Sequence, residues 1–538
     1  MRIGTRVLMA GVAAVALAAS GALAAEAKKG ARAQVPVRPN LVVAQNVTQP
    51  SSNTSSTSDL AMRVQALEDA LAARDERGRA DRTRLSTLEQ QYQYANLTYD
   101  NGRPTFQTGD GRFTMSLRTR FQTDFAGFSQ DQQPASFGGP RDLATGMGVR
   151  RAYLGVEGKA YSDFAYEFRI NVGGSGVEGI ELSKAVVHYI GIPNWHFSLG
   201  IIEPAFQLEG TTSSGNLMFL ERPEIVNIGA DIFGGNDARR GAEIGWAKPD
   251  VFWAGDAVNA TLYFTGGKSH SQLGHGNGGD EQAQMLFRLG NRVWSNGPSN
   301  LAWGMSVAHV FNSGTNAGGG APTINLQDRP QIRVDGTRLI STGAINAQTA
   351  DMIAFDLAGN YENFFLGGEW AQFTLDRRCG NATTTFNGGV CAGQPFRAIA
   401  DNPTFQGWYV EGSWILTGES KPYTVAALNN EIGGFQQPVP SRPFSLNGES
   451  WGAWELAARY SDIDLDWNPR RTASATQLAG ILGGRQRIMD IGVNWYMNRN
   501  VKLQVHNSFV NVDKGTAAIP NRDSQDLNIV GVRLQFSN

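Results

Sequence analysis

Short segments in which apolar and polar residues alternate constrain the fold of this chain most. From residue 96 onward they recur at lengths of about ten residues, separated by clusters of Gly, Asn, Asp, Pro and Ser. In the first segment, Leu117 and Phe121 share one face of the expected strand, and Arg118 and Arg120 share the other. A strand with one apolar and one polar side suits a wall between lipid and a water-filled lumen.

Sixteen segments show this alternation, and an even number lets an antiparallel barrel close with both chain ends on one side. They lie at residues 113–125, 149–161, 164–173, 182–190, 195–202, 240–247, 258–266, 283–294, 301–311, 352–361, 364–375, 406–416, 452–462, 488–497, 501–511 and 526–536. The sequence therefore predicts an all-β fold at residues 96–538, a sixteen-stranded antiparallel transmembrane β-barrel. We expect short turns at one end of the barrel and long loops at the other. The expected long loops are residues 203–239, 312–351, 376–405, 417–451 and 463–487.

The first 24 residues have the composition of a secretory signal peptide. Arg2 and Arg6 supply a positive n-region, residues 7–19 are apolar, and residues 22–24 give a small-x-small cleavage pattern. Residues 25–57 are rich in Ala, Pro, Asn, Ser and Thr without periodicity, which predicts a flexible linker. The chain is therefore expected to cross the inner membrane of a bacterial cell.

Residues 58–95 change to a heptad pattern, which predicts a helix. One a/d frame holds the apolar residues Leu60, Val64, Leu67, Leu71, Leu85, Leu88 and Tyr92. The same frame places Arg74, Gly78 and Asp81 at seam positions, so the apolar seam is interrupted in its middle. We predict a short coiled coil in the periplasm that serves oligomerisation. A lone amphipathic helix or a charged spacer is the alternative.

Composition argues against several other classes of function. Beyond residue 95 the chain carries 35 Lys and Arg against 41 Asp and Glu, a balance that argues against nucleic acid as a partner. His270 and His275 lie in a loop without a known ligand spacing, so no metal and no cofactor is expected. Cys379 and Cys391 can staple one loop in an oxidising compartment, with two free thiols as the alternative.

Several stretches of the expected barrel resemble a known family when they are read in order. The chain resembles the phosphate-selective porins O and P at residues 149–158 (VRRAYLGVEG), 195–246, 407–419, 452–461 and 492–496. The C-terminal aromatic of that family corresponds to Phe536, which Ser537 and Asn538 follow here. The resemblance implies a homotrimeric, sixteen-stranded channel among outer-membrane lipids. It also implies that the third long loop, residues 203–237, folds inward as a constriction. The candidate constriction residues are Glu203, Thr211, Ser213, Glu221 and Arg222.

The family lines its pore with Arg and Lys, and here the alternation places several basic residues on the inner face. The candidate pore-lining residues are Arg118, Arg120, Arg151, Arg169, Lys184, Arg288, Arg459, Lys502 and Arg533. Guanidinium groups fixed on a wall can bind phosphate or carboxylate and still release it. Carboxylates share this face, so pairing across strands is the alternative role. They are Asp124, Glu157, Glu167, Asp356, Glu369, Glu411 and Glu455.

We therefore expect a channel for passive diffusion of small solutes, mainly anions such as phosphate, and no catalytic residues. A general, non-selective pore is one alternative. An outer-membrane enzyme of the phospholipase kind is another; it would need a Ser and a His facing lipid, where His309 is the available histidine. A soluble secreted β-sandwich or adhesin would instead turn the apolar faces toward a dry core.

Overall fold

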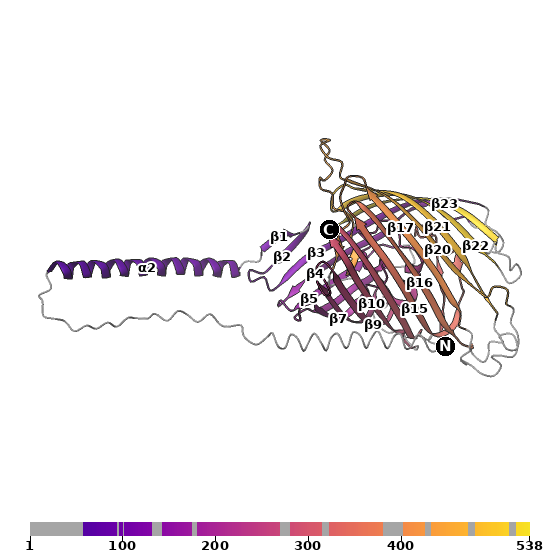
Figure 1. Ribbon diagram of the computed structural model, residues 1–538, viewed down its shortest axis with the longest axis horizontal. Helices are drawn as coiled ribbons and strands as arrows, with labels where there is room; N and C mark the ends of the chain where they lie inside the picture. The colour runs from indigo at the N-terminus through magenta and orange to yellow at the C-terminus, as the bar shows by residue number, and fades with distance from the viewer. Residues whose placement is uncertain are drawn as a thin grey trace. The chain divides into compact units, whose positions relative to one another are not determined.

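The computed structural model describes residues 57–93, 96–100, 102–131, 142–174, 180–268, 280–314, 322–379, 402–425, 432–471, 479–515 and 523–538. Sixteen long strands form one closed antiparallel barrel (Figure 1). They are β3 (Thr114–Gln130), β4 (Gly146–Ala160), β5 (Phe164–Asn171), β6 (Glu181–Tyr189), β7 (Trp195–Ile202), β8 (Arg239–Pro249), β9 (Ala257–Lys268), β10 (Ala283–Asn296), β11 (Ser299–Asn312), β15 (Ile345–Tyr361), β16 (Phe364–Arg377), β17 (Thr404–Ile415), β20 (Ala453–Trp467), β21 (Ile481–Tyr496), β22 (Val501–Lys514) and β23 (Asp523–Ser537). Each predicted segment overlaps one of these strands, and the predicted fold class is confirmed.

The last strand of the barrel pairs with the first. β23 runs antiparallel to β3, with Leu527 opposite Gln130 and Phe536 opposite Phe121. Closure gives each of the sixteen strands two neighbours, so none of them presents a long open edge. A hairpin of β1 (Asn96–Asp100) and β2 (Arg103–Gln107) precedes the barrel and extends its sheet beside β3.

Large apolar side chains cover the outer face of the wall. Phe121 is 44% exposed, whereas its neighbour Gln122 is fully buried. The same contrast repeats along the other strands, as lipid on one side and a lumen on the other require. Trp454 and Trp495 stack at 5.2 Å between ring centroids near one rim, where an interfacial aromatic girdle is expected.

The connections differ in length between the two ends of the barrel. At the end where β3 begins, residues 161–163 and 497–500 form short turns, and we call this the short-turn end. Residues 416–452 also lie at this end, although they form a long connection between β17 and β20. Our expectation that residues 417–451 belong with the other long loops was wrong. β17 is the twelfth barrel strand. After an even number of strands, the chain is again at the short-turn end, where β3 begins.

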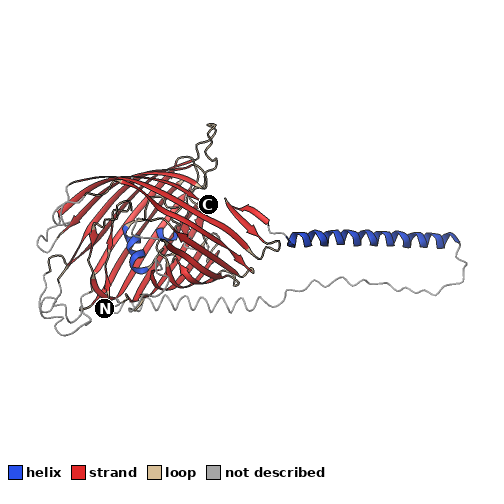
Figure 2. Cartoon of the chain, turned by 180° about the vertical axis from the view of Figure 1, so that it is seen from behind, coloured by secondary structure: helices blue, strands red, loops and turns tan. Residues whose placement is uncertain are grey.

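Among the described residues, three connections reach into the lumen. Loop A is residues 203–238, with the 3₁₀ turn η2 (Glu209–Thr211) and the helix α3 (Glu224–Phe233). Loop B is residues 313–344, with the short strands β12 (Thr323–Ile324), β13 (Gln327–Asp328) and β14 (Ile340–Ser341). The turn insert is residues 416–452, with β18 (Tyr423–Thr424) and β19 (Gly434–Phe435). Figure 2 shows the short helices of loop A inside the ring of strands.

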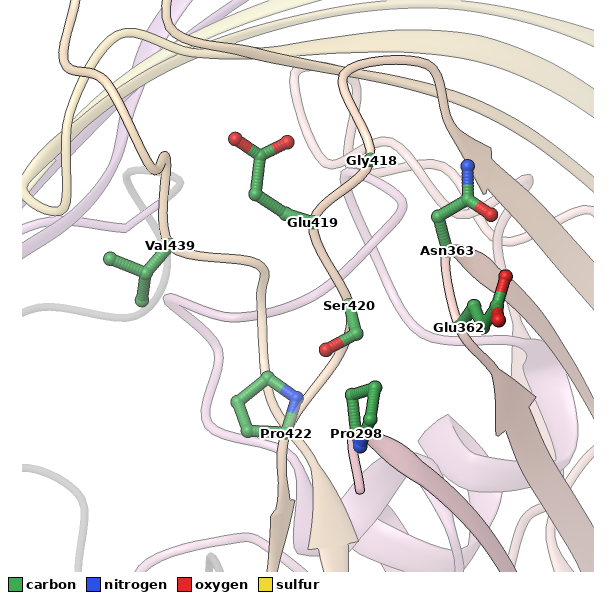
Figure 3. A pocket seen from close by; sticks show the side chains of 8 residues that line it. All are labelled: Pro298, Glu362, Asn363, Gly418, Glu419, Ser420, Pro422 and Val439. Atoms are coloured by element: carbon green, nitrogen blue, oxygen red, sulfur yellow. The ribbon is translucent and has the colours of Figure 1, made fainter. Parts of the chain in front are cut away.

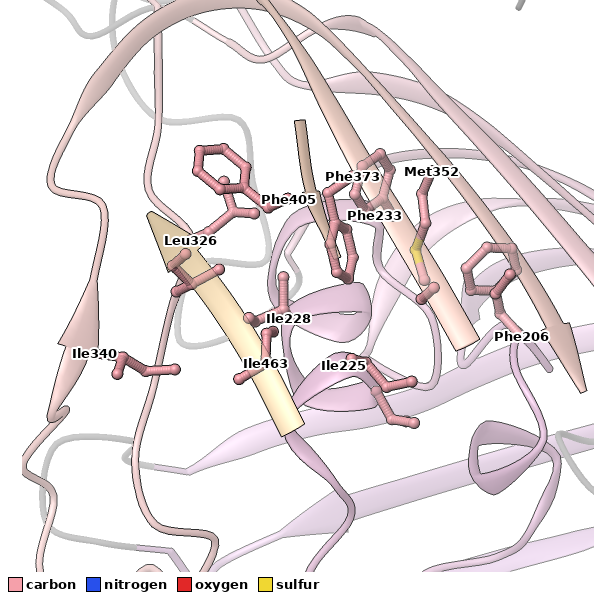
Figure 4. Packing of buried hydrophobic residues seen from close by; sticks show 14 of the residues in the cluster. Phe206, Ile225, Ile228, Phe233, Leu326, Ile340, Met352, Phe373, Phe405 and Ile463 are labelled. Atoms are coloured by element: carbon pink, nitrogen blue, oxygen red, sulfur yellow. The ribbon is translucent and has the colours of Figure 1, made fainter. Parts of the chain in front are cut away.

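An apolar core fills part of the lumen at the long-loop end. Phe233 of α3 stacks on Phe373 of β16 at 6.2 Å between ring centroids, and neither ring is more than 1% exposed. Figure 4 shows Ile228 of loop A close to Leu326 and Ile340 of loop B in the same cluster. The alternation predicted a polar inner face, and that expectation was wrong here, because these inward positions pack against loops instead of facing water.

The helix α2 (Thr57–Gln93) precedes the barrel strands in the chain. It is a single helix of 37 residues. Its seam residues Leu60, Val64, Leu67, Leu71 and Leu85 are each at least 52% exposed. An exposed seam is what a partner helix would cover, and the coiled coil stays a prediction. In the parts of the chain that the structure describes, no helix is both long and apolar enough to cross a membrane. The predicted signal peptide and nearly all of the predicted linker lie outside the described residues.

Candidate pore and its constriction

Loop A is held inside the barrel by side chains of the wall that donate to its main-chain carbonyls. The donor and acceptor pairs are Lys502 to Leu217 (2.9 Å), Asn494 to Met218 (2.9 Å), Arg459 to Glu221 (2.9 Å) and Arg533 to Leu220. The backbone carbonyls of a buried irregular segment need hydrogen-bond donors other than those of a helix or a sheet. Wall cations from three different strands therefore anchor loop A.

Side chains of loop A add further anchors. The Arg120 guanidinium donates to the hydroxyls of Ser214 at 2.6 Å and Ser213 at 2.9 Å. Arg222 braces the loop from within, donating to the carbonyls of Glu209 at 2.9 Å and Thr212 at 2.7 Å. These bonds fix the serine-rich tip of loop A against β3.

Glu221 is the centre of the strongest charge cluster in the described lumen. Its carboxylate lies 2.7 Å from Arg150, 3.4 Å from Arg151, 2.9 Å from Arg533 and 3.8 Å from Arg333. Burial alone would raise the pKa of Glu221, but the surrounding guanidinium groups outweigh burial and hold the pKa well below its usual range. Glu221 is therefore an anion that joins loop A to both the wall and loop B.

Loop B packs on α3 and holds it through polar contacts. Asn227 donates to Asp328 at 3.0 Å, and Arg338 donates to Asp231 at 3.0 Å. Burial, with a contribution from nearby Glu224, raises the pKa of Asp328 to about 7. The Asp328 carboxyl is thus neutral in mildly acidic solution.

A chain of alternating charges follows the inner wall from β2 to the start of loop A, and we call it the charge ladder. It contains the cations Arg103, Arg118, Arg169 and Lys184 and the carboxylates Glu157, Glu167 and Glu203. Arg118 lies 3.0 Å from Glu157 and 3.8 Å from Glu167. Lys184 lies 2.9 Å from Glu167 and 4.0 Å from Glu203. Each carboxylate of the ladder therefore contacts at least two cations.

Cavities lie between the inward connections and the barrel wall in the part of the chain that the structure describes. One, of about 440 Å³, lies between loops A and B and the wall, and its lining includes Arg151, Tyr153, Glu203 and Arg333. The other, of about 690 Å³, lies where the turn insert passes the turn between β15 and β16 (Figure 3). None of the eight residues that line this second cavity is Lys or Arg. The first cavity thus joins the charge ladder at Glu203.

The basic residues that we expected to line the pore each contact loop A, a carboxylate, or both. Arg120, Arg459, Lys502 and Arg533 bond to loop A. Arg118, Arg151, Arg169, Lys184 and Arg288 each lie within 4.0 Å of a carboxylate. Of the constriction residues, Glu203, Ser213 and Glu221 contact wall cations, whereas Thr211 and Arg222 donate to carbonyls within loop A. Contact of any of these residues with a solute stays a prediction.

Sequence reasoning missed Arg150, which strict alternation places on the lipid face beside Arg151. The pairing between β3 and β4 shifts here, because Gln122 is opposite Arg151 while Thr123 is opposite Val149. Such a β-bulge adds one residue to the strand and turns Arg150 inward as well. Two adjacent charges in a lipid-facing strand were the available signal. Arg333 was missed because it lies in loop B, which has no alternation to interpret.

Some other candidate groups lie away from the lumen contacts. His309 of β11 has Met285 and Asp351 directly opposite on its neighbouring strands, and its Nδ1 lies 2.7 Å from Asp351. A thioether and a carboxylate, rather than a nucleophilic hydroxyl, flank this imidazole. Cys379 is disulfide-bonded, and its expected partner Cys391 lies outside the described residues, as do His270 and His275.

A closed sixteen-stranded barrel with an apolar outer face and loops folded into its lumen defines an outer-membrane porin. The profile of the family described as "Phosphate-selective porin O and P" matches residues 115–537. The chain belongs to this family, and the resemblance inferred from its sequence is confirmed.

Individual relatives are distant. "Porin O" of Pseudomonas aeruginosa is 25% identical over 426 residues, which cover 76% of this chain and 85% of that protein. Among solved structures, the outer membrane channel DcaP of Acinetobacter baumannii covers 79% of this chain and 97% of its own, with 9% identity and a TM-score of 0.43. An anion-selective porin from Comamonas acidovorans covers 79% and 100%, with 12% identity and a TM-score of 0.41.

Proposed function

We propose that this chain forms a water-filled channel for passive diffusion of small hydrophilic solutes, with a preference for anions such as phosphate. The excess of guanidinium groups around Glu221 carries the proposal. Four arginines lie within 3.8 Å of this one carboxylate, and one of them, Arg533, also contacts Asp124. Guanidinium groups stay charged at any pH that the protein meets. The surplus positive charge would concentrate anions at the entrance between loops A and B.

A general, non-selective pore is the second candidate, and the pairing of charges favours it. Arg288 and Asp356 form a pair at 2.7 Å, and Arg533 and Asp124 form another at 2.6 Å. A cation whose charge is balanced at contact distance attracts a passing anion less than a free cation does. The two candidates therefore differ in the strength of the anion preference.

Reversal potentials across planar bilayers with a KCl gradient test the proposal. We expect a preference for chloride, and added phosphate should reduce the chloride current. Glu221→Gln removes the central carboxylate at constant volume, so the preference for anions should increase. Asp351→Asn, a carboxylate beside His309 outside the lumen, is the matched control and should leave the potential unchanged. A preference of the wild-type channel for potassium would overturn the anion assignment.

The assembly and placement of the chain complete the proposal. We infer a homotrimer in the outer membrane whose helix α2 lies in the periplasm and joins the subunits as a coiled coil. The exposed seam of α2 supports this arrangement, because burial of the same residues in three copies would remove them from water. Residues 1–24 would serve as the signal peptide, and residues 25–57 as the linker.

A further inference from the structure

Two sides of the lumen differ in how closely loops cover their charges. On the side of β10, β15 and β20, the Arg288 and Asp356 side chains are 2% and 3% exposed, and Arg459 is fully buried. On the side of β2 to β6, the side chains of Arg118, Glu157 and Glu203 keep 13%, 25% and 12% of their surface exposed. Water therefore reaches Arg118, Glu157 and Glu203 of the charge ladder, whereas loop A and the turn insert cover the opposite wall.

The charge ladder also has an opening at the long-loop end of the barrel. Glu203 is both its last carboxylate and part of the lining of the 440 Å³ cavity between loops A and B. Tyr153 lines the same cavity, and the Arg169 guanidinium lies 4.6 Å from the centre of its ring. A solute that enters this cavity thus reaches Glu203, and Arg169 and Lys184 follow Glu203 along the ladder.

We propose that solutes cross the barrel along the charge ladder, and that its carboxylates Glu157, Glu167 and Glu203 determine the selectivity of the channel. This inference rests on the proposed channel function and specifies its path. Among its described members, the ladder has four cations and three carboxylates. Neutralising one carboxylate makes this row more positive by one charge, whereas neutralising one cation makes it less positive by one charge.

Glu167 is the most informative of the three carboxylates. It contacts Lys184 at 2.9 Å, Arg169 at 3.7 Å and Arg118 at 3.8 Å, and its side chain is 6% exposed. Its removal would release three cations toward a permeating anion at once. Small solutes with both a positive and a negative group suit the intact ladder, because they can replace a cation and a carboxylate contact together.

The test compares Glu167→Gln with a matched control in planar bilayers under a KCl gradient. Glu167→Gln should raise the ratio of chloride to potassium permeability by about twofold or more. Glu369→Gln is the control: Glu369 is equally buried on the covered wall, and glutamine can still accept from Tyr409 and the Leu208 amide. An unchanged ratio in Glu167→Gln channels, or an equal shift in the control, would overturn the inference.

Thiol labelling gives a second readout that does not depend on selectivity. Arg118→Cys should react with a charged methanethiosulfonate added to the open channel, and the current should fall by half or more (about twofold). Ser306→Cys, fully buried between Arg288 and loop A, should not react. Block at Ser306→Cys but not at Arg118→Cys would move the path to the other wall. Absence of any conductance would instead refute the proposed function. Because the inference rests on that function, it would be refuted as well.

Discussion

Replacing Phe233 with alanine should release loop A from the wall without unfolding the barrel. Phe233 ends α3, is 1% exposed, and stacks on Phe373 of β16. Truncating a buried phenylalanine costs about 3–5 kcal/mol. The upper part of that range applies here, because a wall held by continuous strand pairing cannot collapse into the void.

This cost falls on the docking of loop A rather than on the global fold. Each 1.4 kcal/mol changes an equilibrium about tenfold, so the undocked population of loop A should rise by about three powers of ten or slightly more. Hydrogen exchange of the α3 amides measures that population, and we expect much faster exchange there with unchanged protection in the barrel strands. Single-channel currents should become noisier as the loop moves in the lumen.

A matched control separates docking from a general effect of losing an aromatic ring. Phe355 of β15 lies on the outer face, is 46% exposed, and stacks on Trp370. Phe355→Ala should leave both α3 exchange and current noise as in the wild type. If α3 exchange is the same in Phe233→Ala as in this control, loop A is not held by the apolar core.

Three further substitutions probe loop B, the strand contacts and the helix. The pKa of Asp328 is raised to about 7 from an ordinary value of 3.8 when loop B is docked. The docked state therefore keeps a proton that the released state loses. Docking of loop B should weaken as pH rises from about 4 to about 7. Asp328→Asn should remove this pH dependence in hydrogen exchange of residues 325–341; a dependence that persists would refute the role of this carboxyl. At Gly158 an added Cβ would lie 1.8 Å from the Thr114 carbonyl oxygen, so Gly158→Ala should lower barrel stability by about 2–4 kcal/mol. Heat-modifiable gel mobility reports this change, and an unshifted unfolding temperature would contradict the close contact of β3 and β4. Leu67→Asp places a charge on the α2 seam and should dissociate the oligomer, whereas Asp69→Asn, outside the seam, should not. Light scattering measures the molecular mass of each variant, and equal masses of the two variants would exclude a coiled coil.

The sequence predicted the wall of the barrel because the signal there is local. Lipid on one side and a lumen on the other force neighbouring residues such as Phe121 and Gln122 to differ, so the alternation identifies each strand. The end of the barrel at which residues 416–452 lie could also have been obtained by counting strands. The resemblance to a family added the inward loop, which no local pattern indicates.

The contacts inside the lumen could not be predicted in the same way. Whether Lys502 binds a solute or the Leu217 carbonyl depends on a loop almost 300 residues away in sequence, and no periodicity records that distance. The apolar inner positions of β16 and β20 were missed for a related reason, since their partners come from loops A and B. The bulge at Arg150 adds a single residue to the strand. One added residue is too local a change for the alternation of a whole strand to reveal it.

The most direct measurement is single-channel recording of the purified, folded wild-type protein in planar lipid bilayers. We expect discrete steps of current, proportional to voltage, from protein that shows heat-modifiable mobility. Folded protein that inserts into the bilayer and yields no current steps would contradict the central claim that this barrel encloses a path for water and solutes.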